Sequence, residues 1–311
     1  MRSRMDLSNS QLNLRLLQTL KHHCFNKKAI SKLGLMGLLS LSCLGVVQAK
    51  VIYTEDFETN TGAITKSHPS LHLSGNAPVV VKAEKGITPR GGSHMMKSYL
   101  HRYNSNTTYR TEATIHRYQN FSGLFEKDKD YWLGVSIFIP ADWSMDYRGT
   151  KNGKPVEDRL GGGIVLQFHD RSYKSSTYRS GLPFVVSHSK DGFRIWNRTD
   201  GCRKRPECLA NTNIKNTIKR FSEVAPMKRG QWNDFVMQVK WSPNADGLLK
   251  LWVNGKLELD SKGPNYHNEH PASVYPYFKM GLYQSSFGKS AWSKDIKWNT
   301  LERTLYHDEL R

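Results

Sequence analysis

The 311-residue sequence has few cysteines, a deficit of acidic side chains and no regular repeat. Four cysteines are too few for a disulfide-dense miniprotein. The 24 glycines and 12 prolines follow no fixed spacing, which excludes collagen-like and solenoid folds. After residue 50 the sequence lacks helical periodicity over twelve or more residues. Because 38% of the residues are hydrophobic and 11% aromatic, the chain can still bury a core, and wholesale disorder is excluded.

Residues 1–49 are predicted to be a secretory signal peptide. Lys27, Lys28 and Lys32 precede an apolar run over residues 33–47, and the small Ala49 occupies the expected cleavage position. The run is short for a permanent span and no charge cluster follows it, although a membrane-anchoring helix is the alternative. We therefore expect a secreted or periplasmic protein that begins near Lys50 and has no stable membrane association after cleavage.

The net charge indicates the kind of partner. Lys and Arg number 46 against 27 Asp and Glu, a formal charge of +19, and +13 is left when residues 1–49 are removed. A cationic exported protein attracts polyanions over a Debye length of about 8–10 Å. The sequence has no helix-turn-helix, zinc-finger or RNP-type pattern, so we expect no nucleic-acid partner. An acidic polysaccharide is the predicted partner, and charge kept for solubility is the alternative.

The rest of the chain is typical of short strands separated by turns. Two alternating runs, 249–253 and 256–259, flank Asn254-Gly255, which predicts a two-residue hairpin. With no internal linker, this pattern indicates one all-β domain over residues 50–311, a sandwich or jelly roll of antiparallel sheets. Further strands are predicted over residues 51–53, 109–115, 131–139, 164–169, 184–188, 235–241, 277–283 and 305–310.

Three of these strands carry a row of polar side chains on one face, because successive residues of a strand point to opposite faces. Taken alone, each row has an ordinary explanation: an ion pair, a surface histidine or a solvated face. Gly281 leaves room in the third row for something to approach the backbone. The rows consist of Arg110, Glu112 and Thr114; of Gln167 and His169; and of Tyr277, Lys279 and Tyr283.

A cation, an amide, an imidazole and a phenol together suit β-elimination from a uronic acid. The uronate carboxylate must be neutralised before the adjacent proton can leave, and Arg or Gln, with His beside them, can donate hydrogen bonds to it. Tyr, with an ordinary pKa near 10, can act as base or acid when cationic neighbours lower that pKa. His, with an ordinary pKa near 6.5, is the alternative base.

Three segments resemble the signature strands of family 7 alginate lyases: Arg110-Thr111-Glu112, Gln167-Phe168-His169 and residues 277–284. The wider pattern is similar to the heparin lyase I and glucuronan lyase group, through residues 131–143, 232–235, 251–255 and 306–308. The resemblance implies a β-jelly roll with a concave, cationic cleft and an eliminative cleavage that leaves a 4,5-unsaturated end, with no required cofactor. The resemblance favours glucuronan or a heparin-like glycan over alginate as the substrate, because the wider pattern is similar to the heparin lyase I and glucuronan lyase group.

The resemblance also implies residue roles. Arg110 and Gln167 would neutralise the carboxylate, and His169 would take the C5 proton of one epimer. Tyr283 would act as the acid, or as both acid and base for the other epimer. Glu112 would orient Arg110. All four catalytic side chains are expected to converge on one sugar ring, while Tyr277, Lys279 and Gln284 would bind substrate. Phe168 stands where the alginate enzymes usually carry Ile or Val, a position that the family ties to epimer preference.

Cys202 and Cys208 enclose a basic loop that contains Arg203, Lys204 and Arg205. In an exported protein such a pair is most simply a disulfide, and a zinc site would need more ligands, so no metal centre is expected. The loop would flank the cleft and hold the polyanion, or be a solvated insertion.

Two further features stay open. Residues 161–163, three glycines, would form a mobile lip or merely a turn. Asp56, Glu58 and Asp308 would come together if the first and last strands pair, and would then offer a structural calcium site.

Two other function classes compete with the lyase. One is a non-catalytic jelly-roll lectin for acidic glycans. The other is a glycoside hydrolase, which needs two carboxylates flanking the bond, whereas only Glu112 is suitably placed.

Overall fold

Antiparallel pairing joins the strands of two large sheets and one small sheet in this computed structural model. Lys50–Arg311 form one compact unit, to which every described residue belongs. The structure describes residues 50–59, 62–64, 71–102, 109–115, 125–144, 146, 148–157, 163–169, 182–189, 192–198, 218–266, 276–287 and 296–311. The predicted signal peptide lies outside this set. Among the described residues, no helix has the length and apolar character needed to cross a membrane.

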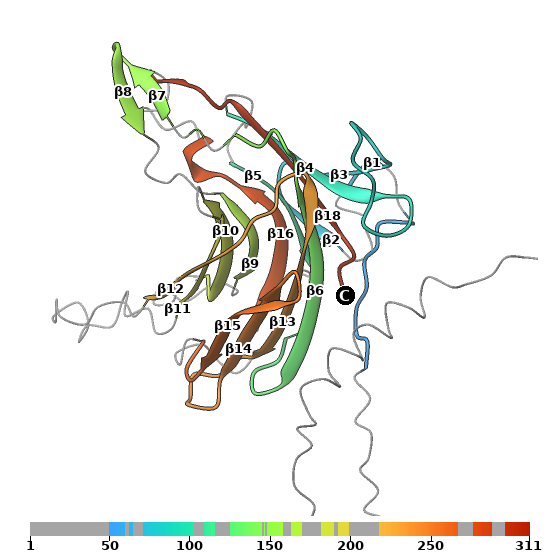
Figure 1. Ribbon diagram of the computed structural model, residues 1–311. Coiled ribbons are helices and arrows are strands. Elements are labelled where there is room, and N and C mark those ends of the chain that lie inside the picture. Colours follow the sequence, from blue (N-terminus) through green and yellow to red (C-terminus); the bar gives the residue numbers. More distant parts are fainter. Residues whose placement is uncertain are drawn as a thin grey trace, which may run out of the picture. The chain divides into compact units, whose positions relative to one another are not determined.

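The first large sheet has eight strands, and the second has seven (Figure 1). In spatial order the first contains β1 (Gly62–Ala63), β3 (Val79–Val81), β4 (Met95–His101), β18 (Glu302–Asp308), β6 (Asp130–Ile139), β13 (Gln231–Lys240), β14 (Leu248–Val253) and β15 (Lys256–Lys262). The second contains β12 (Ile218–Ala225), β11 (Gly192–Arg198), β10 (Phe184–Ser189), β9 (Ile164–His169), β16 (Tyr277–Tyr283), β5 (Arg110–Ile115) and β2 (Leu71–Gly75).

A third, small sheet consists of β17 (Ile296–Trp298), β7 (Arg148–Lys151) and β8 (Lys154–Glu157), and one short 3-10 helix, η1, covers Ser285–Phe287. Five of the thirteen neighbouring pairs in the large sheets join strands far apart in the sequence, as β18 between β4 and β6 illustrates. The prediction of an all-β jelly-roll sandwich of antiparallel sheets is confirmed.

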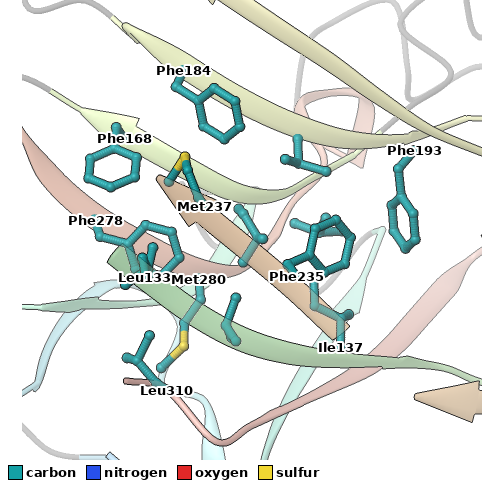
Figure 2. Packing of buried hydrophobic residues seen from close by; sticks show 14 of the residues in the cluster. Leu133, Ile137, Phe168, Phe184, Phe193, Phe235, Met237, Phe278, Met280 and Leu310 are labelled. Atoms are coloured by element: carbon teal, nitrogen blue, oxygen red, sulfur yellow. The ribbon is translucent and has the colours of Figure 1, made fainter. Parts of the chain in front are cut away.

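The core lies between the two large sheets (Figure 2). Phe168, Phe278 and Met280 come from the seven-stranded sheet, and Phe235 and Ile137 come from the eight-stranded sheet. Truncating one buried Phe in such a core typically costs about 3–5 kcal/mol of stability. Since the side chains of a strand alternate, the residues between these core positions point to the opposite face of the sheet. The polar rows of β5, β9 and β16 therefore lie on the face of the seven-stranded sheet that is turned away from the core.

The predicted Asn254-Gly255 hairpin is confirmed between β14 and β15. Both turn residues have positive φ, 52° and 81°, as a type I′ turn requires. The same device joins β7 to β8 through Asn152 and Gly153, with φ of 50° and 75°. This second hairpin was not predicted from the sequence, because Lys151 and Lys154 flank its turn in place of an apolar alternation.

The predicted strand over residues 51–53 is wrong. In the structure this segment is irregular, and only Glu55 pairs with the C-terminal segment, by an isolated antiparallel bridge to Leu310. Three apolar residues are too weak a pattern to predict a strand at a chain end. The last strand, β18, is confirmed with its start shifted to Glu302.

Candidate functional site

The three strands that carry the polar rows lie side by side, with β16 between β9 and β5. Tyr283 pairs with Arg110 across β16 and β5, and Lys279 pairs with both Thr114 and Gln167. Paired residues point to the same face of a sheet. The rows therefore merge into one polar surface on three adjacent strands. These strands come from separate segments of the sequence and are joined by long-range pairing.

Arg110 and Tyr283 meet at one end of this surface. The guanidinium carbon of Arg110 lies 4.1 Å from the centroid of the Tyr283 ring, within the range of a cation–π interaction. Both side chains are half-buried, so each keeps some contact with solvent. Nη1 of Arg110 also lies 3.5 Å from Oε2 of Glu112. This contact with a buried carboxyl of the same strand holds the guanidinium in place.

Glu112 is the buried carboxyl of the site, with an exposed fraction of 1%. Its Oε1 accepts a hydrogen bond from Nε2 of Gln167, and its Oε2 faces Arg110. Burial raises the pKa of Glu112 above its ordinary value, although Lys279, Arg110 and the bond from Gln167 work in the other direction. One carboxyl thus links the arginine of β5 with the amide of β9, and the orienting role of Glu112 stays a prediction.

His169 lies at the other end of the polar surface. It pairs with Tyr277, and their rings are stacked at 5.3 Å. Nζ of Lys279 lies 5.6 Å from the centroid of the same Tyr277 ring. Tyr277 and Tyr283 are six positions apart on β16, so about 20 Å of strand lies between them. His169 and Tyr283 are therefore on one face but contact different neighbours, and their convergence on one sugar ring stays a prediction.

Gln167 and Lys279 occupy the middle of the surface and are buried, at 1% and 3% exposed. Oε1 of Gln167 is buried and has no hydrogen-bond partner in the described part of the chain. Its amide nitrogen is directed to Glu112. Gln167 thus contacts the arginine-orienting carboxyl directly, and Arg110 is the more accessible of the two predicted carboxylate-binding residues.

The space at Gly281 is filled by the neighbouring strand. A Cβ atom on Gly281 would lie 2.2 Å from the carbonyl oxygen of Thr111 and 2.6 Å from Cα of Glu112. The φ of Gly281 is 141°, which also favours glycine. The glycine serves the close approach of β5 to β16, and the expectation that it leaves room for another group is corrected.

Phe168 faces away from the polar surface. It is fully buried in the core, where its ring lies 5.0 Å from the rings of both Phe125 and Trp241. A substrate on the polar surface cannot touch this ring. Any influence of this position on epimer preference must act through its chain neighbours, Gln167 and His169.

Gln284 is also outside the polar surface. It is 1% exposed, and its Oε1 lies 3.2 Å from Nε2 of His188, a fully buried histidine of β10. The predicted contact of Gln284 with substrate is therefore not supported by its position. The sequence analysis did not single out His188, although alternation places it in the apolar row of Phe184 and Val186, where a titratable side chain is unusual.

Several predicted features lie outside the described residues: Cys202, Cys208, the basic residues Arg203, Lys204 and Arg205, and the first two glycines of 161–163. Gly163 is described, and its N–H donates to His188. Neither the disulfide nor the basic loop is tested, and both stay predictions.

Two of the three acidic residues considered for calcium, Glu58 and Asp308, bind the same backbone segment, and Asp56 accepts the N–H of Glu58. Oδ2 of Asp308 accepts the N–H groups of Arg90 and Gly91, and Glu58 accepts those of Ser93 and His94. Among the described residues no group of three or more His, Cys, Asp or Glu could hold a metal ion. Calcium binding stays a prediction.

Comparisons with known proteins agree with this architecture. A family model described as polysaccharide lyase matches residues 81–311. The endo-beta-1,4-glucuronan lyase from the fungus Trichoderma reesei is 15% identical with a TM-score of 0.57, covering 81% of this chain and 92% of that one. The alginate lyase vAL-1 from Chlorella virus is 14% identical with a TM-score of 0.47, covering 84% and 98%. At 15% identity the glucuronan lyase shows similarity of fold alone.

A curated protein, rat alpha-(1,3)-fucosyltransferase 7, is 21% identical over 134 residues, which is 43% of this chain. The chain spans about a third of that protein's length.

Proposed function

The chain belongs to the polysaccharide lyase family, and from this membership we propose that it cleaves a uronate-containing polysaccharide by β-elimination. The substrate that we propose is glucuronan or a heparin-like glycan, ahead of alginate. The observation that carries this proposal is the contact of Arg110 with Tyr283 on the polar surface, at 4.1 Å. A guanidinium beside a phenol supplies both of the groups that the reaction needs: a cation for the carboxylate and an acid–base group for the proton.

In the proposed reaction, Arg110 binds the carboxylate of the uronate and stabilises the negative charge that develops when the C5 proton leaves. Tyr283 acts as the base and takes that proton. The electrons of the C5–H bond form the C4–C5 double bond, the C4–O4 bond breaks, and the departing O4 takes the proton back from Tyr283. Tyr283 returns to its starting form, no water is consumed, and no cofactor is required.

One tyrosine suffices for both transfers when the C5 proton and O4 lie on the same face of the sugar ring, as they do in a β-1,4-linked glucuronate. A guluronate of alginate, with the opposite configuration at C5, would need a base on the other face. His169 is the predicted base for such an epimer, but it groups with Tyr277 at the far end of the polar surface. The contact of Tyr283 with Arg110, with His169 against Tyr277, favours the single-tyrosine route and hence a uronate whose C5 proton and O4 share a face, which is glucuronate or mannuronate and not guluronate.

The other residues have supporting roles in this proposal. Glu112 and Gln167 form a buried chain behind Arg110 and fix its guanidinium. Lys279 and Arg110 are two cations around one buried carboxyl, so the polar surface favours an anionic ligand. His169 and Tyr277 would bind sugar units further along the polymer. We also propose that residues 1–49 direct export, which would bring the protein to such polymers.

The proposal is tested by incubation of the protein with glucuronan, heparin, heparan sulfate, hyaluronan, polymannuronate and polyguluronate, while the ultraviolet absorbance of the new double bond is followed. We expect the fastest rise with glucuronan or a heparin-like chain and a slower one with polyguluronate. Turnover of polyguluronate alone would contradict the single-tyrosine route. Binding of these polymers with no rise in absorbance would contradict the enzyme and favour a lectin.

A further inference from the structure

A buried group of three residues lies behind the polar surface, on the core side of the seven-stranded sheet. His188 and Gln284 are 0% and 1% exposed, and Gly163 is buried beside them. The N–H of Gly163 donates to Nε2 of His188 at 2.7 Å, and the N–H of His188 donates to the carbonyl of Gly163 at 2.9 Å. His188 therefore forms hydrogen bonds to Gly163, the residue that precedes β9, through both its main chain and its ring.

Gln284 connects this pair to the other two signature strands. It directly follows Tyr283, and its own N–H donates to the carbonyl oxygen of Tyr109, the residue before Arg110, at 2.8 Å. Its carboxamide lies 3.2 Å from Nε2 of His188. One residue thus joins β16, β5 and β10 at the end of the sheet where Arg110 meets Tyr283.

This arrangement requires a neutral imidazole with an unprotonated Nε2, because only such a nitrogen can accept the N–H of Gly163. The surroundings enforce that state. The ring is enclosed between the sheets against Trp143, at 4.9 Å between ring centroids, and burial together with the nearby Arg303 lowers the pKa of His188 well below its ordinary value. Oε1 of Gln284 faces the same nitrogen at 3.2 Å, and exchanging the two ends of the carboxamide would place a donor there.

The fit leaves no room for a larger residue at position 163. A Cβ atom on Gly163 would lie 2.5 Å from Nε2 of His188 and 2.5 Å from Oε1 of Gln284. Glycine is required here by close packing, with no positive φ involved. The third glycine of 161–163 therefore belongs to a fixed contact and not to a lip over the site.

We propose that His188 is a positioning residue of the lyase: through Gly163 and Gln284 it fixes the start of β9 and the end of β16, and thereby the placement of Tyr283 beside Arg110. It does not touch the polar surface and transfers no proton. This positioning role rests on the proposed function in one respect, which is that the placement of Tyr283 determines the rate of elimination.

His188→Gln and His188→Leu form a matched pair of variants, because the two side chains are similar in size and only glutamine can accept the N–H of Gly163. With the polyuronate that the wild type degrades fastest, measured well below the melting temperature of each variant, we expect His188→Leu to lower kcat about tenfold or more with KM within about twofold. His188→Gln should restore kcat to within about threefold of wild type. If His188 were instead a general base, both variants would lose activity, and the positioning role would be wrong. Equal kcat in the wild type and the leucine variant would also overturn the proposal.

A second measurement needs no substrate. In hydrogen exchange followed residue by residue, His188→Leu should accelerate exchange at the N–H groups of Gly163 and Gln284, while exchange at the β13–β14 ladder stays unchanged. His188→Gln should leave all of these rates near wild type. Unchanged protection of Gln284 in the leucine variant would refute the positioning role even if the wild type degraded none of the polymers, so the two proposals fail separately.

Discussion

Replacing Tyr283 with phenylalanine removes one oxygen atom from the polar surface and leaves the ring in place. The ring retains its cation–π contact with Arg110, which is worth about 0.5–1 kcal/mol at an exposed site and does not require the hydroxyl. The fold and the binding of polymer should therefore persist, and KM should change little. What is lost is the group that carries the proton from C5 to O4. General acid–base groups contribute about 10²–10⁴-fold to a rate, so kcat should fall by that factor, or by about 3–5 kcal/mol of transition-state stabilisation.

Tyr277→Phe is the matched control, since both tyrosines lie on β16 and face the same side, six residues apart. Tyr277 stacks on His169, and its hydroxyl has no part in the proposed transfer. We expect this variant to retain kcat within about threefold, with any loss in KM. The assay is the initial rate of double-bond formation on the best polyuronate, at several substrate concentrations. If Tyr283→Phe kept near wild-type kcat while Tyr277→Phe lost it, the elimination would occur at the His169 end and the present reasoning would be wrong.

Three more predictions concern packing, acidity and salt. Gly281→Ala should destabilise the protein by roughly 2–4 kcal/mol in urea unfolding, because its Cβ would collide with Thr111. Gly134→Ala is the matched control: its Cβ would lie 4.0 Å from the nearest heavy atom, an ordinary contact, and stability should change by less than about 1 kcal/mol. Burial opposes the charged form of Glu58, but hydrogen bonds from Ser93 and His94 outweigh it and lower the pKa of Glu58 to about 2. The ionised carboxylate therefore contributes about 2 kcal/mol, after solvent screening, to the free energy of unfolding. This stabilisation should be complete above pH 4.5 and disappear as the pH falls toward 2, and Glu58→Gln should not show this loss of stability. Finally, kcat/KM on a polyuronate should fall steeply between about 50 and 500 mM salt, and a flat profile would show that the +13 charge of residues 50–311 does not assist binding.

Local patterns in the sequence predicted the parts of the fold that local chemistry determines. Asn254 and Gly255 specify their turn by backbone preference alone, and alternation in residues 277–283 places Phe278, Met280 and Leu282 in the core. Short strands such as β7 and β8 were missed because their side chains are mostly charged or polar, and their pairing follows from an Asn-Gly turn without an apolar face.

The site was predicted as a set of residues more successfully than as a geometry. Alternation identified the polar faces of β5, β9 and β16, and these faces do merge. Register between strands from distant segments is not readable from alternation, however, so the sequence could not separate the Arg110–Tyr283 end from the His169–Tyr277 end. The burial of Gln284 against His188 was equally hidden, since it depends on how η1 and β10 pack after the chain has folded.

The central claim is that the chain breaks its polymer by elimination, with no water entering the product. Digestion of glucuronan in heavy-oxygen water, followed by mass spectrometry of the fragments, tests this directly. Elimination predicts fragments whose masses sum to that of the intact chain, with one unsaturated end formed for each cut and no heavy oxygen at the newly formed reducing end. Heavy oxygen at that end, with the mass of one water added for each cut, would mean hydrolysis and would contradict the account.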